Sequence, residues 1–173
     1  MNEVSGQISI VINAPVAKVY AYLLDFPRHP EWVKNLQRVR PESDGPTRVG
    51  ATFQTQEGPP PVTLWQKLPM MFHFLNGVLS GAKTYSRAEI TALEPNRRIA
   101  WQAGVPKGDG FFNLAQWELL LEPQGQATCL TQRFVYRPQN GAAQRMIDAA
   151  GATGLERACA VNLEQLKQRL EQN

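Results

Sequence analysis

The sequence has only two cysteines and two histidines, and neither sign of charge dominates it. Cys129 and Cys159 form no C-x-x-C pair and show no metal-ligand spacing, so we expect reduced core thiols and no metal site. Lysine and arginine number 18 against 15 acidic residues, and the two signs are interspersed. This mixture is typical of an ordinary solvated surface and argues against a nucleic-acid partner.

The sequence also lacks a hydrophobic run long enough to span a bilayer. Its longest charge-poor stretch lies at 58–82, and the apolar part, LPMMFHFLNGVL, is too short for a transmembrane helix. The first residues, MNEVSGQ, do not show a basic start followed by an apolar stretch, as a secretory signal would. We therefore expect a cytoplasmic protein without an integral membrane segment.

What is present is the composition of one folded domain. Hydrophobic residues make up 43% and charged residues 19% of the 173 positions, close to the globular average. This length suits a single core, and no repeat, low-complexity tract or linker divides it. Residues 1–173 are therefore expected to form a single domain.

The amino-terminal residues predict a strand followed by two short helices. Apolar and polar side chains alternate over 7–12, as in a strand with one buried face. Pro15 suits the first turn of a helix, and apolar residues over 16–24 recur every three or four positions. The prolines at 27 and 30 are expected to end this helix. A second short helix carrying Trp32, Val33 and Leu36 should follow.

Turn-forming clusters then separate segments rich in β-branched and aromatic residues. We predict six further strands, near 36–41, 48–56, 83–93, 98–104, 112–122 and 127–137. From Asn140, a residue suited to cap a helix, the period changes to that of one long helix ending near Gln172. This order predicts an α+β fold in which a twisted, seven-stranded antiparallel sheet wraps around the terminal helix.

Several stretches support a family resemblance. The segment ISIVINAPVAKVYAYLLDFPRHPEW (8–32) resembles the beginning of START-like (SRPBCC) superfamily members, and RVGATFQT (48–55), ALEPNRRIAWQA (92–103) and AVNLEQLKQRLEQ (160–172) agree. Within the superfamily the sequence is most similar to the polyketide cyclase/dehydrase and lipid-transport group. The resemblance implies a helix-grip fold with a deep, largely apolar cavity between sheet and terminal helix.

Alternation along the strands assigns side chains to the inner face of the sheet: Ala51, Phe53, Thr84, Ser86, Ala88, Ile90, Ile99, Trp101, Trp117, Leu119, Leu121, Leu130, Gln132, Phe134 and Tyr136. The strand at 84–92 contributes mainly Thr, Ser and Ala, and the helix offers Ala150, Gly151 and Gly154. Small residues on both sides either enclose space or let helix and sheet pack closely. A sealed void of roughly 300 Å³ would cost about 7 kcal/mol, so a real cavity must admit water or a ligand.

The apolar insert at 57–82 departs from the resemblance. It is rich in Met and Phe, which can repack around varied apolar shapes. One interpretation is a lid over the cavity, with Met70, Phe72, His73 and Phe74 as its candidate contact residues. The alternatives are an extra helix outside the core or a dimer contact.

Little in the sequence requires catalysis. His29 lies in a proline-rich kink and is expected at the surface, whereas His73 could point into the cavity mouth. No Ser/His/Asp order stands out, and no pair of carboxylates falls on the inner face. Gln132 is the preferred ligand-orienting residue, unless a neighbouring backbone group satisfies it. The candidate binding residues are Phe53, Thr84, Ser86, Trp101, Trp117, Gln132, Phe134, Gly151 and Leu155.

Two main functional hypotheses remain open. The first is a binding protein that carries or sequesters a hydrophobic small molecule, such as a lipid, isoprenoid or polyketide, without a cofactor. The second is a cyclase- or dehydratase-type enzyme using the same cavity, and a protein-interaction module is a third. Superfamily cyclases use arginine and tyrosine to bind a polyketide, whereas Tyr85, Arg87 and Arg133 face outward in the predicted register. Only amides and hydroxyls in the cavity would favour binding, and an ionisable pair would favour catalysis.

Overall fold

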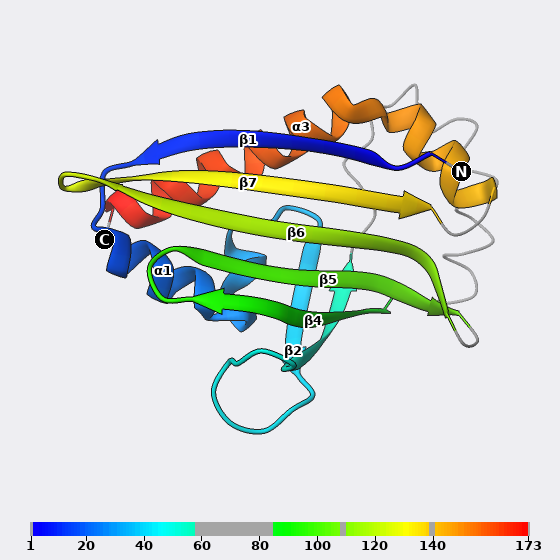
Figure 1. Cartoon of the computed structure of the whole chain (residues 1–173), viewed down its shortest axis with the longest axis horizontal. Helices are drawn as coiled ribbons and strands as arrows, with labels where there is room; N and C mark the ends of the chain where they lie inside the picture. Colours follow the sequence, from blue (N-terminus) through cyan, green and yellow to red (C-terminus); the bar gives the residue numbers. More distant parts are fainter. Residues whose placement is uncertain (1, 58–84, 108–109, 139–140, 173) are drawn as a thin grey trace.

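The computed structural model describes residues 2–57, 85–107, 110–138 and 141–172. Within them, strands form a seven-stranded antiparallel sheet in the order β1-β7-β6-β5-β4-β3-β2 (Figure 1). The strands are β1 (Val4–Ile12), β2 (Leu36–Pro41), β3 (Thr52–Glu57), β4 (Tyr85–Glu94), β5 (Arg98–Lys107), β6 (Gly110–Gln124) and β7 (Ala127–Pro138). The helices are α1 (Val16–Leu24), the 3₁₀ helix η1 (Phe26–Glu31) and the long α3 (Gly141–Gln172).

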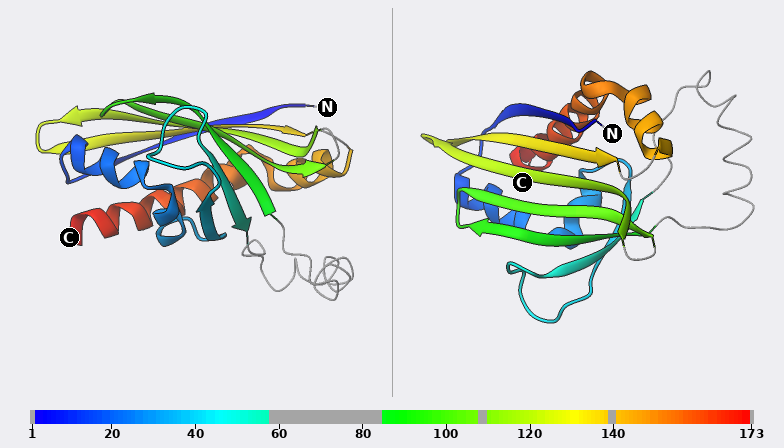
Figure 2. Two further views of the ribbon diagram at one scale, coloured as in Figure 1. Left: turned by 90° about the horizontal axis from the view of Figure 1, so that it is seen from below. Right: turned by 45° about the vertical axis from the view of Figure 1, so that its right-hand side comes forward.

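The helices α1 and α3 lie on the same side of the curved sheet (Figure 2). The carboxy-terminal half of α3 buries Leu163, Leu166 and Leu170 in a core that also contains Val19 and Leu23 of α1. This arrangement confirms the predicted fold, a twisted antiparallel sheet around a long terminal helix. None of the described helices is long and apolar enough to cross a membrane.

The predicted faces of the strands are also confirmed. Ile90, Ile99 and Leu119 are fully buried, whereas Tyr85 and Arg133 are exposed. Alternation succeeds here because side chains along a strand point to opposite faces, and only one face of this sheet is covered by helices.

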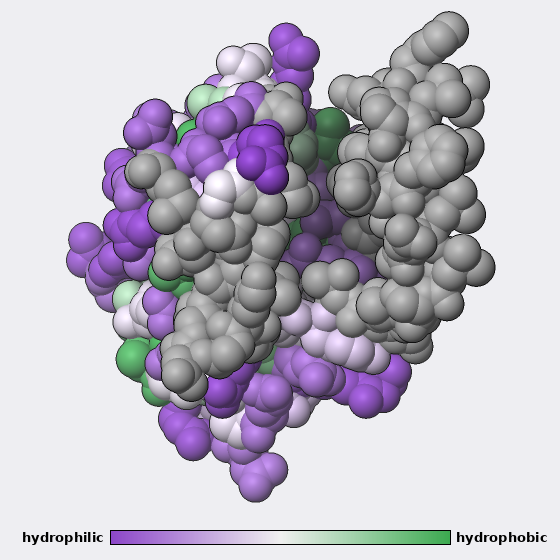
Figure 3. All heavy atoms as spheres, turned by 90° about the vertical axis from the view of Figure 1, so that its right-hand side faces the viewer, coloured by the Kyte–Doolittle hydropathy of each residue, from purple (hydrophilic) through white to green (hydrophobic). Residues whose placement is uncertain are grey.

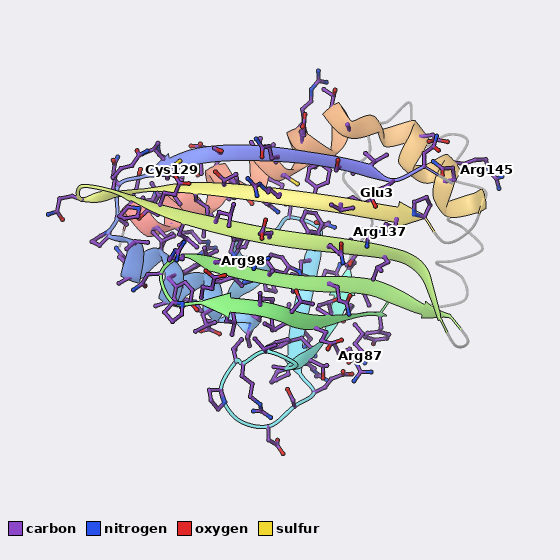
Figure 4. The ribbon with its side chains drawn as sticks, viewed as in Figure 1. Glu3, Arg87, Arg98, Cys129, Arg137 and Arg145 are labelled. Atoms are coloured by element: carbon purple, nitrogen blue, oxygen red, sulfur yellow. The ribbon has the colours of Figure 1, made fainter. Side chains whose placement is uncertain are left out.

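Arginines on the outer face pair with carboxylates. Arg98 Nε lies 2.6 Å from Glu118 Oε1, and Arg133 Nη1 lies 3.4 Å from Glu118 Oε2. Arg137 and Glu3, adjacent where β7 pairs with β1, are 2.6 Å apart between Nε and Oε2 (Figure 4). The register that buries the apolar side chains therefore keeps these charges in water.

Two short helices follow β1 as predicted, but the second does not carry Trp32, Val33 and Leu36. Helix η1 instead occupies the proline-containing stretch before these residues, and Leu36 begins β2. Hydrogen bonds of this turn use non-proline donors: Arg28 N–H donates to Asp25 O at 2.9 Å, and Trp32 N–H to His29 O at 3.1 Å. The two prolines are tolerated because these hydrogen bonds do not use their nitrogens.

Helix α3 is interrupted at Gly151, whose φ of 64° and ψ of 164° are not helical. This kink changes the phase between the two parts of the helix, so one periodic face cannot describe 140–172. Gly154, expected opposite the sheet, is exposed. The proposed cap, Asn140, lies outside the described residues.

Gly6 allows β1, β7 and α3 to approach closely. A Cβ at this position would lie 2.6 Å from Phe134 Cζ and 2.8 Å from Glu156 Oε1. The ring of Phe134 is 1% exposed and belongs to the packed interior. A side chain at position 6 would therefore displace a buried aromatic ring.

We predict that Gly6→Ala lowers the free energy of unfolding by about 1–3 kcal/mol, the usual cost of overpacking. Urea unfolding followed by circular dichroism measures this change. Gly141→Ala is the control, because its Cβ would meet only Arg145 Nη1, at 3.8 Å. Equal stability of Gly6→Ala and the native protein would contradict the close packing described here.

Candidate functional site

A cavity of about 480 Å³, partly open to solvent, lies between the sheet, α3 and the segment from η1 to β2. Strands β3 to β7 all contribute to its lining, as do residues 155–162 of α3. The end of the molecule seen in Figure 3 is recessed, and both apolar and polar residues are visible within the recess.

The cavity owes its depth to small side chains in one row of the sheet. Ala88, Ala103 and Ala115 are directly paired on β4, β5 and β6, and all three line the cavity. The row continues to Phe53 on one side and Tyr136 on the other. Directly paired residues project from the same face of a sheet. Three methyl groups between two aromatic rings therefore leave space that larger residues would fill.

The next row toward the core supplies a wall of aromatic rings. Trp101 and Trp117, paired on β5 and β6, are stacked with centroids 6.3 Å apart and planes inclined by 17°. Phe26 from η1 meets Trp101 edge-on, at 5.4 Å between centroids. Flat rings from two strands and η1 thus surround one end of the cavity, which suits a ligand with a flat apolar surface.

Helix η1 and the residue that follows it bring three aromatic side chains inward. Phe26, His29 and Trp32 are 2%, 4% and 1% exposed and all line the cavity. They are spaced by three, the number of residues in one turn of a 3₁₀ helix, so they lie above one another on one side. The expectation that His29 lies at the surface is therefore wrong. The proline spacing, read as a 3₁₀ signal, could have identified this face.

Burial makes His29 an uncharged part of the wall. Its Nε2 lies 2.8 Å from Leu23 O, and its ring stacks on Phe26 with centroids 4.3 Å apart. Burial lowers the pKa of His29 to about 4, although the hydrogen bond to Leu23 acts in the opposite direction. The imidazole is neutral at physiological pH and donates through Nε2 to the Leu23 carbonyl.

Polar contacts hold η1 and the residues that follow it against α3. Arg169 Nε donates to Glu31 O at 2.7 Å, and the Lys34 backbone N–H donates to Asn162 Oδ1 at 3.2 Å. Asn162 also lines the cavity. Glu31, the last residue of η1, and Lys34, three residues later, are therefore both bound to α3. These two contacts fix the side of the cavity that lies opposite the sheet.

Gln132 is a buried amide whose oxygen has no hydrogen-bond partner among the described residues. Its side chain lines the cavity and is 4% exposed. Its Oε1 has no hydrogen-bond partner, and no hydrogen bond to the amide is found within the described residues. Trp32 Nε1 is likewise buried and unpaired there. Buried polar groups are nearly always satisfied, so this part of the cavity favours a molecule that brings a polar group.

Ionisable groups lie toward β3 and α3. Ser86 Oγ donates to Glu57 Oε1 at 3.3 Å, and both residues line the cavity. Desolvation raises the pKa of Glu57, and the hydrogen bond from Ser86 partly opposes this. Glu57 is exposed at the end of β3, but its position continues the alternation from Phe53 through Thr55, so the sequence pattern could have identified it.

Tyr136 is a neutral neighbour of both Glu57 and Cys159. Burial, with smaller effects of Cys159 and Glu57, raises the pKa of Tyr136 well above its usual value. Burial, together with the nearby charge of Glu156, raises the pKa of Cys159 to about 12. Both residues line the cavity and keep their protons at neutral pH.

The structure brings together part of the predicted set. Ser86, Trp101, Trp117, Gln132 and Leu155 line the cavity. Phe53 and Phe134 are instead packed behind its lining, where Phe53 stacks on Phe26 and Phe134 lies against Trp117. Gly151 marks the kink of α3.

Some of the predicted site residues lie outside the described residues. They are Thr84 and the lid candidates Met70, Phe72, His73 and Phe74. Within the described part of the chain, no cluster of three His, Cys, Asp or Glu side chains could hold a metal ion.

Residues 3–171 match the family described as polyketide cyclase / dehydrase and lipid transport, and the chain therefore belongs to this family. No curated protein gave a match.

Solved structures share the fold at low sequence identity. The ZhuI aromatase/cyclase from Streptomyces sp. R1128 is 12% identical, with a TM-score of 0.68 over 98% of this chain and 94% of that one. A START superfamily protein from Mycobacterium smegmatis is also 12% identical, with a TM-score of 0.66 over 98% of both chains. A protein from Deinococcus radiodurans is 21% identical, with a TM-score of 0.58 over 96% of both chains. These likenesses show a START-like fold.

The buried imidazole predicts a specific acid sensitivity. Between pH 6.5 and about 4 the unfolded chain binds a proton at His29 that the folded chain does not, so acid favours unfolding in this window. We expect this group to lower the free energy of unfolding by about 3 kcal/mol between pH 7 and pH 4. Urea unfolding at several pH values should show this extra loss in the native protein relative to His29→Gln. Equal acid-induced losses in the two proteins would contradict the burial of a neutral imidazole.

Proposed function

We propose that the protein binds a hydrophobic small molecule in this cavity, as a carrier or sequestering protein. The observation that carries the proposal is the Gln132 amide oxygen, which has no partner within the described residues and lies in a cavity lined largely by aromatic and small apolar side chains. Apolar walls with a few polar groups are typical of sites that bind and orient small molecules. Membership of the polyketide cyclase / dehydrase and lipid-transport family supports the same class of ligand.

The size of the cavity supports a ligand rather than loose packing. Left dry and sealed, about 480 Å³ would cost about 12 kcal/mol at the coefficient found for core truncations. That cost equals or exceeds the stability of most domains. The space must therefore hold water or a ligand, and an apolar ligand that displaces water from aromatic walls gains hydrophobic free energy.

A cyclase- or dehydratase-type activity is the second candidate, and Glu57 favours it. This carboxyl has a raised pKa, accepts a hydrogen bond from Ser86 and lies near the phenol of Tyr136, which is a common setting for a proton-transfer group. Against it, Tyr85, Arg87 and Arg133 are exposed on the outer face. Binding requires only the cavity and its polar anchor, so it is our primary proposal.

A cavity-filling variant tests binding directly. We predict that Ala103→Leu weakens binding of the uncharged dye Nile red at least about tenfold, because the added side chain occupies the space above the alanine row. Dye fluorescence measures affinity, and urea unfolding should show stability that is unchanged or higher. Ala21→Leu, the same substitution at an exposed position of α1, should bind as the native protein does. Full binding by Ala103→Leu would place the dye elsewhere.

Native mass spectrometry of protein purified from its own host tests the proposal without a chosen probe. We predict a co-purifying apolar molecule in the native protein and its loss from Ala103→Leu, because the larger side chain removes its space. Absence of such a molecule, together with no binding of Nile red, would reject the proposed function.

Turnover separates the two candidates. If the protein only binds, a β-diketone chain able to cyclise should be recovered unchanged by mass spectrometry after incubation. A cyclised or dehydrated product that disappears in Glu57→Gln would instead establish catalysis, with Glu57 as the group that moves the proton.

A further inference from the structure

We infer that the cavity selects an uncharged ring compound carrying a hydroxyl or carbonyl group and discriminates against its carboxylate analogue, with Glu57 determining this selectivity. The inference rests on the proposed function, since it specifies which hydrophobic molecules the cavity accepts. It also separates ring alcohols and ketones from fatty acids and other apolar anions, which the fold alone does not do.

The polar groups deep in the cavity are uncharged. Gln132 offers an amide, and the imidazole of His29 is neutral with its Nε2 engaged by the Leu23 carbonyl. Tyr136 and Cys159 keep their protons at neutral pH because burial raises the pKa of each. A ligand carboxylate at Gln132 would give up its hydration and receive hydrogen bonds from neutral groups only, which is a poor exchange for a charged group.

Glu57 adds like-charge repulsion. It lines the cavity, accepts the Ser86 hydroxyl hydrogen bond at 3.3 Å and contributes to the electrostatic environment of Tyr136, four residues after Gln132 on β7. Lys34 is the lysine of the described lining and is exposed, as Glu57 is, but its anchoring contact to Asn162 uses the backbone N–H, whereas the Glu57 carboxylate itself is held by the Ser86 hydroxyl. The carboxylate of Glu57 therefore opposes a second anion in the cavity more directly than Lys34 attracts one.

The remaining chemistry fits a neutral ring compound. The stacked pair Trp101 and Trp117, with Phe26 edge-on to Trp101, offers flat apolar surfaces. The Gln132 amide can both donate to and accept from a hydroxyl, and it can donate to a carbonyl. A ligand hydroxyl that donates to Oε1 satisfies this unpaired atom without bringing a charge into the cavity. A ring ketone can only accept from the amide nitrogen, so a ring alcohol matches both features more fully.

A matched pair of ligands tests this inference. Naphthalene-2-methanol and 2-naphthoate share a ring system and differ in charge, and binding of each is measured by isothermal titration calorimetry at about pH 8, where carboxylates are ionised. We expect the alcohol to bind at least about tenfold more tightly than the carboxylate, as one repulsive charge contact and the lost hydration would produce.

Three variants assign the selectivity. Glu57→Gln should strengthen naphthoate binding severalfold and so narrow the gap between the two ligands, because it removes the charge but keeps the shape. Gln132→Leu should weaken the alcohol severalfold, because it removes its hydrogen-bonding partner. Glu122→Gln, at an exposed position of β6, is the control and should change neither affinity.

The outcomes separate this inference from the function on which it rests. Comparable native affinities for alcohol and carboxylate, or a gap that Glu57→Gln leaves intact, would overturn the inference while binding by the cavity stands. If neither naphthalene compound nor Nile red binds, both the inference and the proposed function fail.

Discussion

The row of alanines across β4, β5 and β6 is the constraint on which the site depends. Sheet and helix approach each other as closely as their facing side chains allow, and large residues on both sides would meet and exclude solvent. Ala88, Ala103 and Ala115 present only methyl groups toward α3. The helix cannot descend to fill the space, because Leu163, Leu166 and Leu170 fix its other half in the core. The carboxy-terminal half of α3 is thus packed tightly on the sheet and holds the rest of the helix away from the row of alanines.

Helix η1 forms the third side of the cavity, and the period of a 3₁₀ helix determines which of its side chains face inward. Its spacing of three places Phe26, His29 and Trp32 on one side, and the bond from His29 to the Leu23 carbonyl ties this side to the end of α1. That carbonyl lies at the carboxyl end of α1, where backbone acceptors lack partners within the helix. One buried imidazole therefore satisfies a helix end and contributes an apolar ring face to the cavity.

Local patterns predicted most of the fold and part of the cavity lining. The period of two along each strand placed Trp101, Trp117 and Gln132 inside, and the outward arginines followed from the same alternation. Pairing between strands is not local, so the alignment of Ala103 with Ala115 could not be predicted from either strand alone. The prolines at 27 and 30 follow the end of α1 at Leu24, as predicted, but they also fit a 3₁₀ turn, and neither this turn nor the kink at Gly151 follows from helical periodicity.

The distribution of charge follows from the same architecture and bears on function. Arginines on the outer face find carboxylates and water there, whereas the inner face beneath α3 carries alanine, tryptophan and an unpaired amide. A ligand that enters must replace water without introducing an unpaired charge, since a buried charge costs far more than a buried hydroxyl. Glu57 lies between the charged outer surface and the apolar cavity, and its carboxylate accepts a hydrogen bond from the Ser86 hydroxyl. Its carboxylate is therefore placed to influence which molecules enter and, if one of them carries an acidic C–H bond, to remove that proton.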